Sequence, residues 1–311
     1  MNSKILVSGS VAYDRIMDFP GLFREHIVPE KLHVLNVSFA VQAYRESFGG
    51  TAGNIAYSLA LLNDRPTVLA SVGTDFGAYE THLRAKNIDL SLVRRSVKKA
   101  TATATIITDR DDNQITGFYP GALFDAINTA TIPRQAQYAI VAPGNLKDMA
   151  RLPRIFKKSR TPYVFDPGQQ TVRLSSVELL AGMKGASVLI GNDYEIALIQ
   201  QKAKITLAGM LKLVDAVITT LGAKGSLIET AKGQIRIAPT KPKRIVDPTG
   251  AGDAYRSGLL HGLTRGWTLK KSAQLGSVVA VHAVECYGTQ AHKFNLKTIN
   301  QRYKNTFHET L

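Results

Sequence analysis

Seven consecutive residues decide the fold of this chain: Asp247-Pro248-Thr249-Gly250-Ala251-Gly252-Asp253, near the start of its last third. The residues that follow predict a helix over 254–263. Two glycines flanking an alanine leave little side chain to obstruct a ligand, so an anion can approach the backbone closely. If the helix begins here, the N–H groups of residues 250–253 lack partners and lie at its positive end. The stretch therefore predicts an anion site suited to a phosphate.

Two interpretations of Asp253 remain open from this stretch alone. In the first turn of a helix, a carboxylate can do no more than interact favourably with the helix dipole. Beside an anion site, it can also act as a general base that takes a proton from an attacking hydroxyl. In that second case the amides of Gly250, Ala251 and Gly252 would stabilise the charge on a transferring phosphoryl group.

The composition describes an ordinary globular protein with an unusual positive charge. A length of 311 residues permits one or two domains with a large core. The net charge of +15 fits either a nucleic-acid partner or a field that attracts anionic substrates. The basic residues are scattered in small clusters, and no zinc spacing or RNA-binding aromatic motif accompanies them, which argues against nucleic acid. The single cysteine, Cys286, excludes an internal disulfide and predicts a reducing, cytoplasmic location. No signal peptide or membrane-spanning stretch is predicted.

Most of the chain alternates between apolar strands and helical segments. This rhythm predicts an α/β fold with a doubly wound, mostly parallel sheet and helices on both faces. The motifs of dinucleotide-binding and P-loop proteins are absent from the sequence. Ligands of such sheets bind at the carboxyl ends of the strands. The polar residues expected at that edge are Ser10, Asp14, Asn145, Asp166, Gln169, Gln170, Asn192 and Thr220.

Two segments read as strands of a separate, small sheet. Residues 34–48 alternate apolar and polar side chains, and residues 101–119 are rich in threonine and isoleucine with a turn at 109–113. A period of two is typical of half-buried antiparallel strands.

Several short motifs carry a structural and a functional interpretation side by side. Asn54, after a glycine-rich turn, can cap a helix or contact a ligand. Asn192 and Glu195 have the spacing of a capping box. The turn at 219–226 can be a plain hairpin, or Thr220 can donate to a phosphate oxygen. The adjacent amides of Gln169-Gln170 need partners in a crevice and suit the edge of a purine.

Taken together, these motifs resemble the ribokinase-like (PfkB) family of sugar and nucleoside kinases along nearly all of the chain. The resemblance implies a single domain over 1–311, with a lid formed by two insertions at about 13–48 and 98–121. It implies that Asp253 is the catalytic base and that ATP and Mg²⁺ are required. The residues implied to bind the nucleotide are Asn192, Thr220, Gly222, Gly225 and Gly252, with Glu195 holding Mg²⁺ through water. Asp247, Thr249 and Gly288 match positions that often bind a monovalent cation, so K⁺ is also expected.

Within that family the chain is most similar to actinobacterial-type adenosine kinases. The residues implied to bind the nucleoside are Ser10, Asp14, Ser38, Gly50, Asn54, Phe118, Gln169, Gln170 and Arg173. Where such an enzyme would show a second aromatic residue in the lid, this chain has Ala102, Ala104 and Ile106, which leaves strict adenosine specificity open.

The resulting hypothesis is phosphorylation of the 5′-hydroxyl of a purine nucleoside, most of all adenosine to AMP in purine salvage. A ribose or other sugar kinase is the alternative with the same chemistry. A basic nucleic-acid-binding protein without kinase activity is the alternative from another class. Because exposed sheet edges need cover, a homodimer through the lid is also expected.

Overall fold

The computed structural model describes residues 5–311, and its main sheet has eight strands in the order β14-β13-β12-β11-β10-β9-β1-β4. From β4 to β12 all neighbours pair in parallel, whereas β13 and β14 are antiparallel additions. The strands are β1 (Ile5–Ser8), β4 (Pro66–Leu69), β9 (Tyr138–Val141), β10 (Tyr163–Phe165), β11 (Ala186–Asn192), β12 (Val214–Thr220), β13 (Ser226–Thr230) and β14 (Gly233–Ile237). The chain leaves β1 toward β4 on one side and returns to β9 on the other. The gap between β1 and β9 is therefore the switch point at which ligands of such sheets bind.

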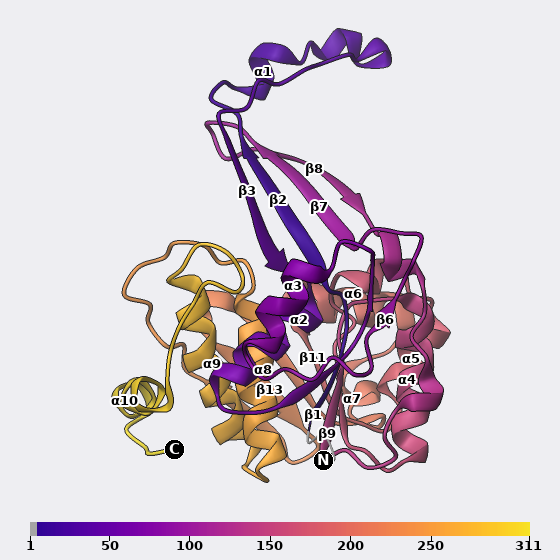
Figure 1. Cartoon of the computed structure of the whole chain (residues 1–311). Helices are drawn as coiled ribbons and strands as arrows, with labels where there is room; N and C mark the ends of the chain where they lie inside the picture. Colours follow the sequence, from indigo (N-terminus) through magenta and orange to yellow (C-terminus); the bar gives the residue numbers. More distant parts are fainter. Residues whose placement is uncertain (1–4) are drawn as a thin grey trace.

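Helices cover both faces of this sheet, as predicted (Figure 1). Val188 and Ile190 of β11 belong to one core cluster, whereas Leu189 between them belongs to the other. One face packs on α2 (Thr51–Leu61), α3 (Gly77–Arg84), α8 (Ala251–Thr264) and α9 (Leu269–Val284). The other packs on α4 (Leu146–Lys158), α5 (Ser176–Met183), α6 (Asp193–Ala203) and α7 (Leu207–Met210). Burial on both faces explains why the parallel strands are apolar throughout. The last helix, α10 (Leu296–Phe307), packs on α9.

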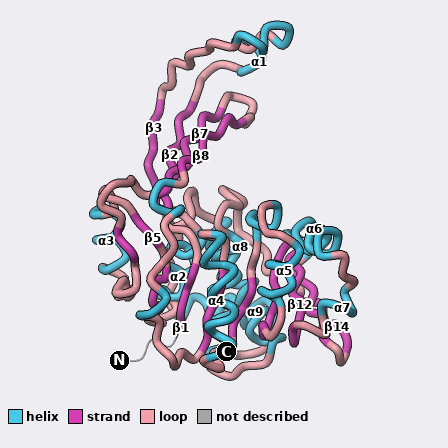
Figure 2. Tube along the Cα trace, turned by 90° about the vertical axis from the view of Figure 1, so that its right-hand side faces the viewer, coloured by secondary structure: helices cyan, strands magenta, loops and turns pink. Residues whose placement is uncertain are grey.

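A second sheet of four strands rises from the body as an arm (Figures 1 and 2). Its order is β3-β2-β7-β8, with β2 (Ala12–Asp18), β3 (Ala43–Gly49), β7 (Ala102–Thr108) and β8 (Gln114–Tyr119). In the turn between β7 and β8, the carboxylate of Asp109 accepts hydrogen bonds from the amides of Asp111 and Asn113. The two expected insertions thus meet in one sheet, and its action as a lid stays a prediction.

The strand predicted over 34–48 is wrong in its first half. Val34 ends a 3₁₀ helix, η1 (Pro29–Val34), and within the predicted segment the strand forms only from Ala43 onward. Phe39, in the irregular part, packs against the rings of Phe19 and Phe23 at centroid distances of 4.9 and 5.0 Å. The alternating pattern there serves an aromatic cluster at the tip of the arm, beside the short α1 (Phe23–His26), instead of a sheet. The strand β2 was not among the predicted strands.

Short elements complete the fold. A small parallel pair joins β5 (Ser71–Val72) to β6 (Arg94–Arg95). Short 3₁₀ helices form at η2 (Gly121–Phe124), η3 (Thr129–Thr131), η4 (Gly168–Val172) and η5 (Gly222–Lys224). Within residues 5–311, no helix has both the length and the apolar character needed to cross a bilayer.

Candidate active site

A cavity of about 910 Å³ opens at the carboxyl ends of the parallel strands, close to the root of the arm. Most of the predicted site residues line it: Ser10, Asp14, Gly50, Asn54, Phe118, Gln169, Gln170, Arg173, Asn192, Glu195, Thr220, Gly222, Thr249, Gly250, Gly252 and Asp253. Five predicted residues do not line it: Ser38, Gly225, Asp247, Ala251 and Gly288. The cavity includes the switch point between β1 and β9, where Ser10 and Pro143 follow the two strands.

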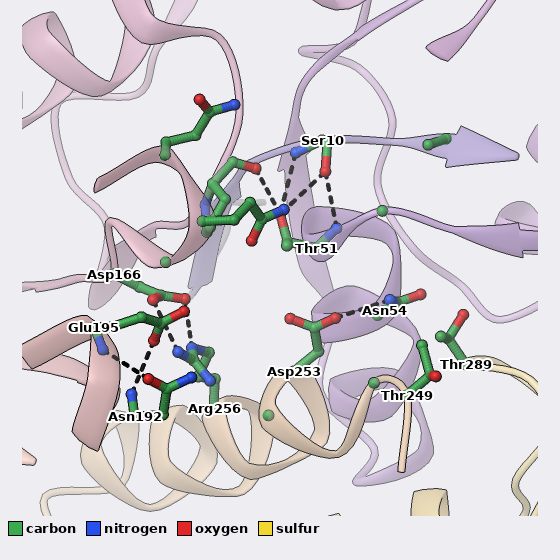
Figure 3. Close-up of a pocket in the computed structure, with 18 of the residues that line it drawn as sticks. Ser10, Thr51, Asn54, Asp166, Asn192, Glu195, Thr249, Asp253, Arg256 and Thr289 are labelled. Atoms are coloured by element: carbon green, nitrogen blue, oxygen red, sulfur yellow. Dashed lines mark hydrogen bonds and ion pairs between the residues drawn. The ribbon is translucent and has the colours of Figure 1, made fainter. Parts of the chain in front are cut away.

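The helix α8 begins where the sequence predicts, and its first turn forms the floor of the cavity (Figure 3). Gly250 caps the helix with a φ of 78°, a left-handed conformation that favours glycine. The amide of Ala251 donates to the Pro248 carbonyl at 3.2 Å, so this predicted anion donor is already occupied. Within residues 5–311, no group accepts a hydrogen bond from the amides of Gly250, Gly252 and Asp253. These amides are therefore the donors available to an anion.

Asp253 projects from this first turn toward Asn54 of α2 (Figure 3). The Asn54 amide donates from Nδ2 to Asp253 Oδ2 at 2.8 Å. Burial raises the pKa of Asp253 to about 6, with Arg256 and Asn54 acting in the opposite direction and Asp166 and Asp14 adding to the rise. A base with a pKa close to neutral is ionised at physiological pH and still accepts a proton readily.

Arg256, which sequence analysis missed, forms a buried ion pair with Asp166 beside the anion site. Its Nη2 donates to Asp166 Oδ1 at 2.8 Å, and its Nε donates to the other carboxylate oxygen. Although burial opposes it, Asp166 raises the pKa of Arg256, so the guanidinium stays charged. A Cβ atom on Gly252 would lie 2.8 Å from Arg256 Nη1, which places the cation next to the free amides. One signal in the sequence could have identified Arg256: it lies one helical turn after Asp253, so the two side chains lie on the same side of the helix.

Asp14 of β2 lies against the glycine that ends the neighbouring strand. A Cβ atom on Gly49 would come within 2.3 Å of Asp14 Oδ2, so only glycine leaves room for this carboxylate. Burial raises the pKa of Asp14 to about 6, and the charge of Asp247 adds to the effect. Nearby, the Ser10 hydroxyl accepts a hydrogen bond from the amide of Thr51 at 3.0 Å. Thr51 is a further cavity residue that was not predicted.

The predicted base-binding residues come from two elements. Gln169 and Gln170 lie on η4, directly after β10, and Arg173 follows them. The Gln170 amide donates from Nε2 to the Gly144 carbonyl at 3.2 Å, and its Oε1 is buried with no partner in the described part of the chain. Phe118 of β8 is 54% exposed and is paired across the sheet with Ala104. Both of these lid positions line the cavity.

The nucleotide motif at Asn192 and Glu195 forms a capping box. Asn192 Oδ1 accepts from the Glu195 amide at 2.7 Å, and Glu195 Oε2 accepts from the Asn192 amide at 2.8 Å. Glu195 keeps its second carboxylate oxygen available, and an oxygen donor of this kind fits Mg²⁺. No cluster of three or more acidic, histidine or cysteine residues that could hold a metal occurs in residues 5–311. Mg²⁺ would therefore depend on water and substrate oxygens for most of its ligands.

The remaining predicted residues have structural roles in this conformation. Gly225 has a φ of 84°, and a Cβ there would lie 2.1 Å from the Ile237 carbonyl oxygen, so its glycine serves the hairpin. Asp247 accepts hydrogen bonds from the amides of Thr249 at 2.9 Å and Gly288 at 3.0 Å. These three residues do lie together, but the backbone amides already satisfy the carboxylate without a cation, so K⁺ stays a prediction.

Ser38, predicted to bind the substrate, is exposed in the segment between η1 and β3. It lies outside the cavity because β3 meets the body at Gly49, whereas Ser38 precedes the other end of that strand, in the segment that packs at the tip of the arm.

Comparisons with known proteins show which family the chain resembles. A profile of the pfkB family carbohydrate kinases matches residues 3–295. The nucleoside kinase of Methanocaldococcus jannaschii is 32% identical over 271 residues, which cover 85% of this chain and 87% of that protein. The solved structure of Burkholderia thailandensis nucleoside kinase in complex with inosine is 33% identical. It superimposes with a TM-score of 0.88 and covers 98% of this chain and 99% of that one.

Proposed function

The chain belongs to the pfkB family of carbohydrate kinases, and on that premise we propose that it transfers the γ-phosphoryl group of ATP to the 5′-hydroxyl of a purine nucleoside. The observation that carries the proposal is the position of Asp253, which stands beside free backbone amides and inside a cavity that also holds Asp14 and Gln170. A related protein, the nucleoside kinase of Burkholderia thailandensis, has also been solved in complex with ADP-inosine.

The proton of the attacking hydroxyl passes to the carboxylate of Asp253. As the oxygen of the substrate hydroxyl attacks the γ-phosphorus, negative charge is spread over the equatorial oxygens of the γ-phosphoryl group and over the leaving β-phosphate. The amides of Gly250 and Gly252 and the guanidinium of Arg256 lie where they can stabilise this charge. Mg²⁺, when bound near Glu195, would neutralise phosphate charge and orient the nucleotide.

Asp14 is suited to the ribose. An ionised carboxylate can accept two hydrogen bonds at once, which fits the adjacent 2′ and 3′ hydroxyls of the sugar. Asp14 lies in the same cavity as Asp253 and Asn54, so a ribose held there would direct its 5′-hydroxyl toward the carboxylate of Asp253.

The unpaired side-chain oxygen of Gln170, Oε1, supports a proposal about which nucleobases the site accepts. A carbonyl oxygen can only accept a hydrogen bond, so the Gly144 carbonyl requires the Nε2 end of this amide, and Oε1 must be the free end. A buried acceptor needs an N–H donor, and binding a base without one leaves it unsatisfied. Adenosine offers its 6-amino group and inosine offers N1–H. Purine riboside offers neither.

The test compares kcat/KM for adenosine, inosine, purine riboside and ribose with ATP. We expect adenosine and inosine to exceed purine riboside by about ten-fold or more, on the scale of a buried unsatisfied group. Gln170→Leu is expected to remove most of this difference by slowing only the two nucleosides that offer a donor. Equal turnover of ribose and the nucleosides would favour a sugar kinase. Salt-dependent RNA binding without any turnover would favour the nucleic-acid alternative.

We also propose a homodimer formed through the arm. Every residue of β8 is exposed, including the apolar Ile115 and Tyr119, and an exposed strand of this kind needs cover. A second copy of the chain is the usual cover for such an edge.

A further inference from the structure

Gln290 lies outside the main cavity, in the loop between α9 and α10. It nevertheless contacts Asn54, the residue that donates a hydrogen bond to the proposed catalytic base Asp253. It is buried, and its side-chain amide makes three hydrogen bonds. Its Nε2 donates to Asn54 Oδ1 at 3.0 Å and also to the hydroxyl oxygen of Tyr79. Its Oε1 lies 3.1 Å from Nε2 of His82.

Each hydrogen bond in this network has only one consistent assignment of donor and acceptor. The Gly49 carbonyl can only accept, so the Tyr79 hydroxyl donates to it at 2.8 Å. The Tyr79 oxygen must then accept from Gln290, which requires the Nε2 end of the Gln290 amide on that side. The same Nε2 group donates to Asn54 Oδ1, and the Asn54 amide is thereby turned with Nδ2 toward Asp253, at 2.8 Å.

His82 closes the network from the other end. Burial lowers the pKa of His82, which favours the neutral ring with one N–H. Because Gln290 presents Oε1 to it, that hydrogen is on Nε2. The His82 ring is itself held between Phe48 and Tyr57, with centroid distances of 4.7 and 5.5 Å.

We propose that Gln290 is a positioning residue: it holds the Asn54 amide with its N–H toward Asp253 and so keeps the carboxylate aimed at the substrate hydroxyl. The inference rests on the proposed kinase function of the same site. Without Gln290, the Asn54 amide can rotate and present its oxygen to the carboxylate, and the two acceptors then repel each other.

Loss of the Asn54 hydrogen bond has a predictable sign. That bond lowers the pKa of Asp253, so its loss raises this pKa further. The other charged groups around Asp253 are Arg256, Asp166 and Asp14, and the substitution changes none of them. Protonation of the base is therefore expected at higher pH, and the acid side of the kcat–pH profile moves the same way.

The experiment compares Gln290→Met with Gln274→Met in the full chain. Gln274 is another buried glutamine, in α9, which accepts a hydrogen bond from the Tyr303 hydroxyl at 2.8 Å and does not line the cavity. Both variants lose a buried amide, so both are expected to lose thermal stability. Gln290→Met alone is expected to lower kcat by about ten-fold, with little change in the KM for ATP, because a base displaced by a fraction of an ångström loses alignment. It alone is expected to shift the acid limb to higher pH.

A second variant keeps the test decisive if Gln290→Met does not fold. His82→Phe retains a ring against Phe48 and Tyr57 and removes only the hydrogen bond that His82 makes to Gln290 Oε1. We expect a smaller fall in kcat with the same direction of pH shift. Unchanged kcat and pH profiles in the folded variants would overturn the proposal.

A carboxyl NMR titration of Asp253 in the ligand-free protein separates this proposal from the proposed function. If the parent phosphorylates no nucleoside but the Asp253 titration still moves upward in Gln290→Met, the positioning holds and the function fails. If the parent is active and the titration does not move, the positioning is wrong.

Discussion

Burial raises the pKa of Asp253 to about 6, and the same burial makes the ionised carboxylate unfavourable to the folded state. Its pKa in an unfolded chain is 3.8, so the folded state binds the proton more tightly. Stability is therefore lost as pH rises through about 6, and the loss persists above it. Asp14 shows the same shift, so the candidate site carries two carboxylates whose charge opposes folding. The hydroxyl groups of a nucleoside would offer these carboxylates hydrogen-bond donors.

Replacing the base is expected to separate stability from activity. Asp253→Asn removes a partly buried charge, so the free energy of unfolding at about pH 8 is expected to rise by about 1 kcal/mol, a value reduced because some solvent reaches the carboxylate. The gain is expected to vanish near pH 4, where the parent carboxyl is protonated. Denaturant titrations at the two pH values check this, and an equal effect at both would contradict it.

The same variant and the parent give the kinetic prediction. In the parent, kcat is expected to fall as pH drops below about 6, because the protonated base cannot accept another proton. In Asp253→Asn, kcat is expected to fall by about 100-fold or more while ATP binding survives. Turnover within a few-fold of the parent would show that Asp253 is not the base.

Arg256 tests how much the fold depends on its buried ion pair. Arg256→Met leaves the Asp166 carboxylate buried without its cation, which is expected to cost about 3 to 5 kcal/mol. The double variant Arg256→Met with Asp166→Leu is expected to recover most of that stability, because neither charge is left alone. Activity is expected to stay low in both, since the cation beside the anion site is missing. Recovered activity in the double variant would remove Arg256 from the site.

At the scale of elements, the root of the arm is where two strands shape one side of the cavity. β2 carries Asp14, and β3 ends at Gly49, which leaves space for that carboxylate. Because β2 pairs along its whole length with β3 and β7, a movement of the arm would carry Asp14 and Phe118 together. The sheet that forms the arm therefore also supplies part of the cavity lining.

Two glycines of this sheet make a matched pair for testing the element. Gly49→Ala places a methyl group within 2.3 Å of an Asp14 oxygen, so the carboxylate must move. Gly117→Ala adds a methyl group in β8 with no atom within 4 Å. Calorimetry is expected to show nucleoside affinity about ten-fold weaker in the first variant, the scale of one charged hydrogen bond, and ATP affinity unchanged. The second variant is expected to bind as the parent does, and equal losses in both would place Asp14 outside the nucleoside site.

At the scale of the whole molecule, the arm stands away from the body (Figure 1), and its edge strand β8 exposes the apolar side chains of Ile115 and Tyr119. Phe118 lines the cavity, and side chains alternate along a strand, so Ile115 and Tyr119 lie on the opposite face of β8. The positive net charge is also a property of the whole molecule. A basic protein attracts an anionic substrate such as ATP over distances longer than a direct contact.

The predicted homodimer can be tested through that outer face. Ile115→Lys puts a charge on the face expected to be buried between two copies, whereas Val177→Lys puts one on an exposed position of α5. Sedimentation over a wide range of concentrations is expected to show a dimer for the parent and for Val177→Lys, and a monomer for Ile115→Lys. A parent that stays monomeric throughout would exclude the dimer without affecting the cavity.

The sequence by itself determined the parallel strands of the main sheet, the helix that starts after Gly250 and the polar residues at the carboxyl ends of the strands, whereas the family resemblance supplied most of the other cavity residues. These features depend on local causes: apolar strands buried on both faces, the period of the helices, and glycines where a left-handed backbone is needed. They could be predicted because each is set by neighbours within a few positions of the chain.

Only the tertiary structure decided which of those residues meet. The partners of the Arg256–Asp166 pair are 90 positions apart, and those of the Asn54–Gln290 bond are 236 apart. The tip of the arm went against its local pattern, because Phe39 gained more from packing on Phe19 and Phe23 than from continuing a strand. Ion pairs, buried amides and aromatic clusters form between surfaces that only folding brings together. For this reason the partners in these contacts cannot be predicted from the pattern of neighbouring residues.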